Sequence, residues 1–132
     1  MVRWMVAYGV MLAASVAPSV QPRAQGFQVH FTWKGVPACS RVSPSFVVEG
    51  VPEGTVTIRF TLHDLEAPNY PHGGGTVRYT GSPLIPKGAL HSYKGPCPPP
   101  AMHHVYRWVV QALGTGGRVL AEQEVTLPYP PL

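Results

Sequence analysis

Three polar side chains able to do chemistry stand at the ends of two segments with strand-like alternation. Asp64 ends the segment 55–64, and His104 and Tyr106 begin the segment 104–113. Asp64 falls on the apolar face of its segment, where a carboxylate loses hydration unless something pairs with it. His104 and Tyr106 share one face of a strand, about 7 Å apart. An imidazole N–H and a phenol O–H so placed suit two oxygens of a phosphate or a carboxylate.

The same spacings also allow structural roles. An Asp before a turn such as Ala67-Pro68 commonly hydrogen-bonds the backbone two residues further on. A histidine and a tyrosine two residues apart also occur on the polar edge of a strand. From spacing alone, therefore, each group has both a binding and a structural interpretation.

The histidines raise the question of a metal. His72, His103 or His104 with Asp64 would offer nitrogen and oxygen ligands. However, the sequence has no H-E-x-x-H and no H-x-H on a strand, and its two cysteines lack C-x-x-C spacing. We expect neither a metal nor a cofactor.

The run His72-Gly73-Gly74-Gly75 is similar to a string that esterases use for an oxyanion hole. Those enzymes also need a G-x-S-x-G nucleophile elbow, which this sequence lacks. A glycine run between strands more often marks a sharp bend or a close backbone approach. We therefore expect no catalytic residue and no enzyme, with a metal-dependent hydrolase as a remote alternative.

The elements that must position these residues are strands. Period-two alternation between Gly- and Pro-rich turns predicts an all-β Greek-key sandwich, a large antiparallel sheet packed on a smaller one. A hairpin turn at 114–117 makes the last two long strands antiparallel neighbours. The expected strands are 27–33, 45–48, 55–64, 76–80, 104–113 and 118–127, with 128–132 as an extended end.

Residues 1–24 have the form of a secretory signal: Arg3, then the apolar run Trp4–Ala17. Cleavage is expected after Ala24 or nearer Ala17, and a retained membrane anchor is the alternative. Residues 25–132 then form one domain. Removal of the signal takes away Arg3 and Arg23, which leaves 8 of the 10 basic residues and all 6 acidic ones, a net charge of +2. This charge is too weak for nucleic-acid binding. The signal-like segment predicts a periplasmic or secreted protein.

Cys39 and Cys97 are the only cysteines. In an oxidising compartment an isolated pair most simply forms one disulfide. Two free thiols or a metal site are the alternatives that the sequence leaves open.

Taken in order, several short motifs resemble the phosphatidylethanolamine-binding protein (PEBP) family, in its bacterial Raf-kinase-inhibitor-like branch. Together they span about residues 39–113. Leu65 and Val105 depart from the family pattern, whose H-W pair has no counterpart here; His72 is the candidate for that missing imidazole. The matching segments are Ser43-Pro44, residues 50–55, D-L-E-A-P at 64–68, G-P-C-P-P at 95–99, H-V-Y-R-W at 104–108 and Gln111-Ala112-Leu113.

The resemblance implies a small pocket at one edge of the fold that accepts phosphate, acetate or a phosphoryl headgroup. Its implied ligand-binding residues are Asp64, His72, Gly95, Pro96, Pro98, His104 and Tyr106. The expected function is that of an exported, non-enzymatic binding protein for a small anion. The alternative is a protease inhibitor or interaction module that contacts a protein partner through the rim residues 68–71 and Lys94.

Overall fold

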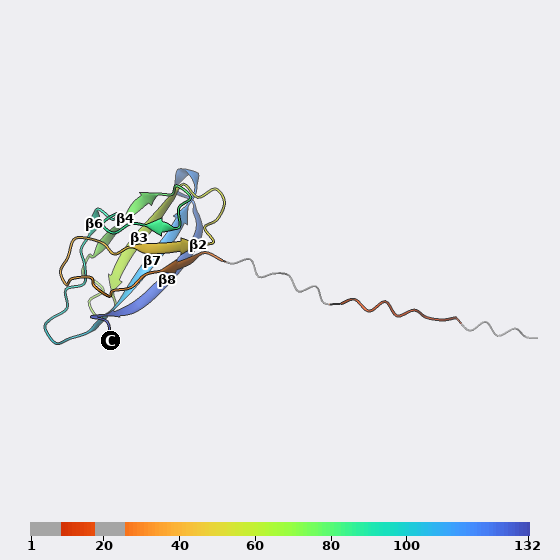
Figure 1. The fold of residues 1–132 in the computed structure, drawn as a ribbon, viewed down its shortest axis with the longest axis horizontal. Helices are drawn as coiled ribbons and strands as arrows, with labels where there is room; N and C mark the ends of the chain where they lie inside the picture. Colours follow the sequence, from red (N-terminus) through yellow and green to blue (C-terminus); the bar gives the residue numbers. More distant parts are fainter. Residues whose placement is uncertain (1–8, 18–25) are drawn as a thin grey trace, which may run out of the picture.

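The computed structural model describes residues 9–17 and 26–132 of the chain (Figure 1). Residues 9–17 have no helix or strand, and their side chains are exposed. Residues 9–17 and 26–132 contain no helix with the length and hydrophobicity of a membrane span. Residues 1–8 and 18–24 of the expected signal segment lie outside the described residues, and so does the expected cleavage point after Ala24. The alternative cleavage point near Ala17 falls at the end of the described range 9–17. The signal and its cleavage therefore stay predictions.

Residues 26–132 contain eight strands and one short 3-10 helix, which are joined by loops and turns. Their order along the chain is β1 (Gln28–His30), β2 (Phe46–Glu49), β3 (Thr57–Asp64), β4 (Gly73–Arg78), β5 (Leu84–Ile85), β6 (Ser92–Tyr93), β7 (His104–Leu113), η1 (Thr115–Gly117) and β8 (Val119–Tyr129).

The strands form two antiparallel sheets. The larger has the order β6-β4-β3-β7-β8, and the smaller has the order β1-β2-β5. The chain leaves the large sheet after β4, crosses to the small one at β5, and returns so that β7 lies on the far side of β3. This return is a Greek-key connection. The expected all-β sandwich is thus confirmed.

Alternation in β3 and β7 builds the core between the sheets. Ile58, Phe60 and Leu62 point inward, and the residues between them point to solvent. Across the layers, the ring of Phe46 on β2 lies 4.6 Å from that of Phe60 and 5.0 Å from that of Trp108, centroid to centroid. In Figure 1, β2 accordingly crosses over β3 and β7. Apolar burial of this kind is the main stabilising term of the fold.

The shorter strands depart from expectation. The segment 27–33 alternates as predicted, but only Gln28–His30 pairs with β2. The fourth strand begins at Gly73, three residues before the predicted start, because the glycines themselves pair with β3 and β6. A Cβ at Gly74 would collide with the carbonyl oxygen of Phe60. The glycine run therefore allows a close approach of backbones.

Cys39 and Cys97 form a disulfide across 58 residues of chain. Two backbone hydrogen bonds flank it, from Cys39 N–H to Pro96 O (2.8 Å) and from Gly95 N–H to Ser40 O (2.8 Å). The bond is compatible with an oxidising compartment. It also fastens the segment 93–99, here called the strap, to the loop before β2.

Candidate functional site

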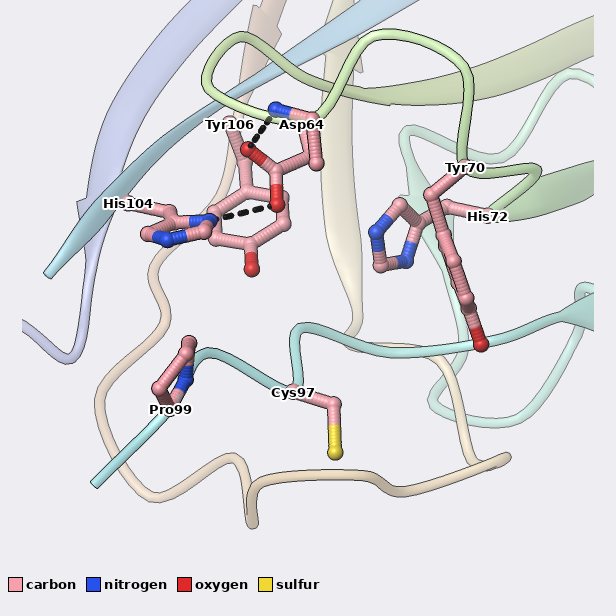
Figure 2. A pocket seen from close by; sticks show the side chains of 8 residues that line it. Asp64, Tyr70, His72, Cys97, Pro99, His104 and Tyr106 are labelled. Carbon is pink, nitrogen blue, oxygen red and sulfur yellow. Dashed lines mark hydrogen bonds and ion pairs between the residues drawn. The ribbon is translucent and has the colours of Figure 1, made fainter. Parts of the chain in front are cut away.

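A pocket of about 330 Å³ opens where the tips of β3 and β7 meet (Figure 2). The two strands pair in a register that sets Asp64 directly opposite Tyr106. His104 precedes Tyr106 by two residues on the same face of β7. The volume lies within the usual range for small-molecule sites. The residues that line it are Asp64, Ala67, Tyr70, His72, Cys97, Pro99, His104 and Tyr106.

The Asp64 carboxylate is buried, with 4% of the residue exposed, and it accepts two hydrogen bonds from the turn that follows it and one from β7. Oδ1 accepts from the backbone N–H groups of Glu66 (2.9 Å) and Ala67 (3.1 Å). Oδ2 lies 2.7 Å from Nδ1 of His104. Burial alone would raise the pKa of Asp64, but these donors and the positive charge of the His104 ring together hold it below its ordinary value. Asp64 thus both closes the turn and orients the imidazole.

This pairing fixes the role of each nitrogen of His104. An ionised carboxylate only accepts, so Nδ1–H must be the donor. Nε2 is left without a hydrogen bond to any described residue, on the side of the ring that faces Pro99 (Figure 2). In the neutral ring Nε2 accepts a hydrogen bond, and in the protonated ring it donates one.

The Tyr106 hydroxyl is fully buried and has no hydrogen-bond partner among the described residues. Figure 2 shows it pointing into the space between His104, His72 and Cys97. Burial, with the charge of Asp64 as the second cause, raises the pKa of Tyr106 above its ordinary value. The hydroxyl therefore keeps its proton at any physiological pH. A buried, unpaired O–H is costly, so it marks a place where a partner is expected.

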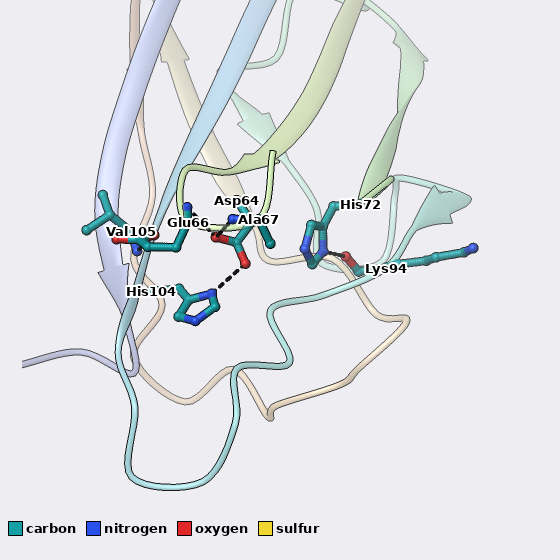
Figure 3. A network of polar contacts seen from close by, with 7 residues as sticks. All are labelled: Asp64, Glu66, Ala67, His72, Lys94, His104 and Val105. Atoms are coloured by element: carbon teal, nitrogen blue, oxygen red, sulfur yellow. Dashed lines mark hydrogen bonds and ion pairs between the residues drawn. The ribbon is translucent and has the colours of Figure 1, made fainter. Parts of the chain in front are cut away.

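His72 supplies a second imidazole on the opposite wall, and only 3% of the residue is exposed. Its Nδ1 lies 2.7 Å from the carbonyl oxygen of Lys94 (Figure 3). Because a carbonyl only accepts, Nδ1–H is the donor, and Nε2 makes no hydrogen bond to a described residue. Both imidazoles of the pocket are therefore held at Nδ1 and unengaged at Nε2.

Asp64, Glu66 and His104 form the one cluster of potential metal ligands among the described residues, with ligand atoms within 4.8 Å of one another. Hydrogen bonds account for its geometry, because Oε2 of Glu66 accepts from the Val105 N–H at 2.7 Å (Figure 3) and Asp64 is engaged as described. Glu66 and Asp64 together join the turn after β3 to the start of β7.

The strap presents alternate residues to the pocket. Cys97 and Pro99 line it. Gly95 lines an adjoining hollow, whereas Pro96 is fully buried and Pro98 is not among the lining residues. Extended backbone turns successive side chains to opposite sides, which explains the pattern. Of the residues predicted to bind a ligand, the structure brings together Asp64, His72, His104 and Tyr106; Gly95, Pro96 and Pro98 lie outside the pocket wall.

Tyr70, which the sequence places only at the rim, also lines the pocket. The residue is 53% exposed, and its ring stacks obliquely on that of His72 with centroids 4.6 Å apart. Its position between two prolines, in the loop that joins Asp64 to His72, was the available signal. A stiff loop between two site residues tends to bring its own side chains to the site.

The fold belongs to a known class. No protein-family model matches the chain, and no curated protein matches it. Among solved structures, the fold is similar to that of proteins of the PEBP type. One of these structures is that of YbcL of E. coli, described as a new member of the mammalian PEBP family, which matches this chain with a TM-score of 0.59 and 22% identity. The match covers 78% of this chain and 97% of that one. The chain thus has the PEBP-like all-β fold that the motifs led us to expect.

Proposed function

We propose that this protein is a non-enzymatic binding protein whose pocket takes phosphate, a phosphoryl headgroup or a similar small anion. The observation that carries the proposal is the Tyr106 hydroxyl, buried and unpaired in the wall of the pocket. An anion oxygen placed there would accept its hydrogen bond and remove the cost of leaving it unsatisfied.

The remaining groups suit the same ligand. A phosphoryl monoester near neutral pH carries both bare oxygens and, in its singly charged form, a P–OH group. The bare oxygens accept from Tyr106 and from a protonated imidazole, and the P–OH donates to a neutral Nε2 of His72 or His104. Asp64 stabilises the positive charge on His104 when the ring is protonated, through the contact of 2.7 Å.

We further propose that the protein acts in the periplasm or outside the cell. The disulfide between Cys39 and Cys97 supports this location, because such bonds persist in oxidising compartments. The signal-like N-terminal segment of the sequence supports it as well.

Calorimetric titration with inorganic phosphate and with phosphoethanolamine tests the binding function. We expect His104→Ala to weaken binding by about tenfold or more, since it removes a hydrogen bond to a charged group. His63→Ala is the matched control, because His63 lies on the exposed face of β3, one residue before Asp64. The proposal fails if the wild-type protein binds neither ligand, or if the two alanine variants bind them equally well.

A further inference from the structure

A second, smaller hollow adjoins the pocket and is lined by positive charge. Its volume is about 100 Å³, and it shares Tyr70 and Cys97 with the pocket. Arg41 and Lys94 line it, and no acidic residue does. Within the described part of the chain, neither cation forms an ion pair. Two uncompensated cations in one hollow favour an anionic group.

The position of Lys94 connects the two hollows. Its carbonyl holds Nδ1 of His72, and its N–H donates to the His72 carbonyl at 2.8 Å. Figure 3 shows its side chain running away from His104, on the far side of His72. The positive charge therefore stands beyond His72 from the Asp64–His104 pair, and Tyr70 stands between the two hollows.

The wall of the second hollow is fixed by covalent and backbone contacts. The disulfide and the hydrogen bond from Gly95 N–H to Ser40 O (2.8 Å) tie its two sides together. A hollow that is already formed does not require the backbone to become ordered when a ligand binds. Its cations are exposed, so they meet an anion without a large loss of hydration.

We propose that the ligand carries two negatively charged groups, one seated in the pocket and the other held by Arg41 and Lys94 in the adjoining hollow. This inference rests on the proposed function, because the first group is the anion of the pocket. It narrows the ligand class from any small anion to an anion with a second charge a few bonds away. A phosphorylated acid in solution and a lipid headgroup that bears both phosphate and carboxylate share this chemistry.

The test compares ligands that differ only in the second charge. Calorimetry at low ionic strength would measure 3-phosphonopropionate against propylphosphonate, and 4-phosphonobutyrate against butylphosphonate. We expect the carboxylated member of at least one pair to bind roughly fivefold more tightly, the range of exposed ion pairs. High salt should reduce this preference.

The variant Arg41→Gln/Lys94→Gln assigns the preference to the hollow. We expect it to bind both members of each pair equally and to retain the affinity of the wild type for inorganic phosphate. Lys34→Gln/Lys87→Gln makes the same change in net charge at exposed positions outside both hollows, so it should retain the preference. A parallel arm uses phosphatidylcholine vesicles with and without phosphatidylserine, so that lipid and soluble sources are distinguished.

A preference for the doubly charged ligand that requires Arg41 and Lys94, in either arm, supports the inference. Phosphate binding without such a preference in either arm overturns it and leaves the proposed function standing. A preference that survives the Arg41/Lys94 variant also overturns it. Absence of any phosphate binding by the wild type overturns the proposed function itself.

Discussion

At the scale of single residues, the polar groups that stabilise the fold by hydrogen bonds differ from those that the pocket leaves unpaired. Asp64 accepts three hydrogen bonds, and Tyr129 donates its hydroxyl to the Val36 carbonyl at 2.8 Å. The Tyr106 hydroxyl and the Nε2 atoms of His72 and His104 are engaged by no described residue. This contrast allows stability and binding to be tested at different atoms.

Replacing Tyr106 with Phe removes only the unpaired hydroxyl. We expect the free energy of unfolding to stay within about 1 kcal/mol of wild type or to rise, because an unsatisfied buried O–H is lost. Phosphate affinity should fall by about tenfold, as for a hydrogen bond to a charged ligand. Tyr129→Phe is the control and should do the reverse, costing about 1 kcal/mol of stability and no affinity. Urea denaturation and calorimetry on both variants measure this, and a Tyr106→Phe variant with wild-type affinity would contradict the assignment.

Asp64→Asn tests the carboxylate. The pKa of Asp64 is lowered in the folded protein from its ordinary value of 3.8. The ionised carboxylate therefore stabilises the fold at any pH above that ordinary value. That contribution is lost as the pH falls through the still lower pKa of the folded state. We expect the variant to lose about 1–3 kcal/mol at pH 7, because an amide nitrogen cannot accept the same bonds.

The measurement is urea denaturation of both proteins at several pH values from 7 to 2. The difference in stability should be present above about pH 4 and should shrink as the pH falls below it, because Asp64 then becomes protonated. Glu53→Gln, an exposed carboxyl on the loop before β3, is the control and should change little. If the difference in free energy of unfolding between the wild type and the Asn variant did not change across this pH range, the charge of the carboxylate would not be what stabilises the turn.

At the scale of elements, the strands that could be predicted from the sequence are those in which apolar and polar residues alternate over a long run. β3 and β7 read clearly because each runs for 8 or 10 residues with one buried face, and this placed Asp64, His104 and Tyr106 on the inner side. β5 and β6 have only 2 residues each. They are defined by pairing with β2 and β4, respectively, so no local sequence pattern predicts them. In the strap, the choice of which alternate residues face the pocket depends on where the disulfide anchors it. Local sequence does not encode that placement, so the motif alone points to Gly95, Pro96 and Pro98, whereas Cys97 and Pro99 are the strap residues that line the pocket.

The glycines of β4 show how tertiary pairing overrides local preference. Gly74 has a φ of +143° and leaves no room for a Cβ beside the carbonyl of Phe60. We expect Gly74→Ala to lower the free energy of unfolding by about 2 kcal/mol or more, through both strain and displacement of β4 from β3. Thermal denaturation would measure it. Gly26→Ala is the control, because no atom lies within 4 Å of a Cβ at that position. An equal effect of the two substitutions would show that β4 can shift away from β3 without loss of stability.

At the scale of the whole molecule, the core and the pocket depend on different connections. The core is closed by the packing of Phe46 against Phe60 and Trp108 between the sheets. The pocket lies beyond this core, and its lower wall is the strap, which is held by the disulfide and a few backbone hydrogen bonds. The packing of the core and the shape of the pocket are therefore expected to respond differently to loss of the disulfide.

Removal of the disulfide, in the variant Cys39→Ser/Cys97→Ser, tests that separation. Closing a 58-residue separation lowers the entropy of the unfolded chain by an amount worth about 4 kcal/mol, the upper expectation for the loss of stability. Because the core contacts remain, near-ultraviolet circular dichroism should still report packed aromatic residues at low temperature. Phosphate affinity should fall more than tenfold, since the strap must then be ordered by the ligand. Reduction of the wild type should reproduce both effects, because both cysteines are exposed. Full affinity in the reduced protein would mean that backbone hydrogen bonds alone hold the strap.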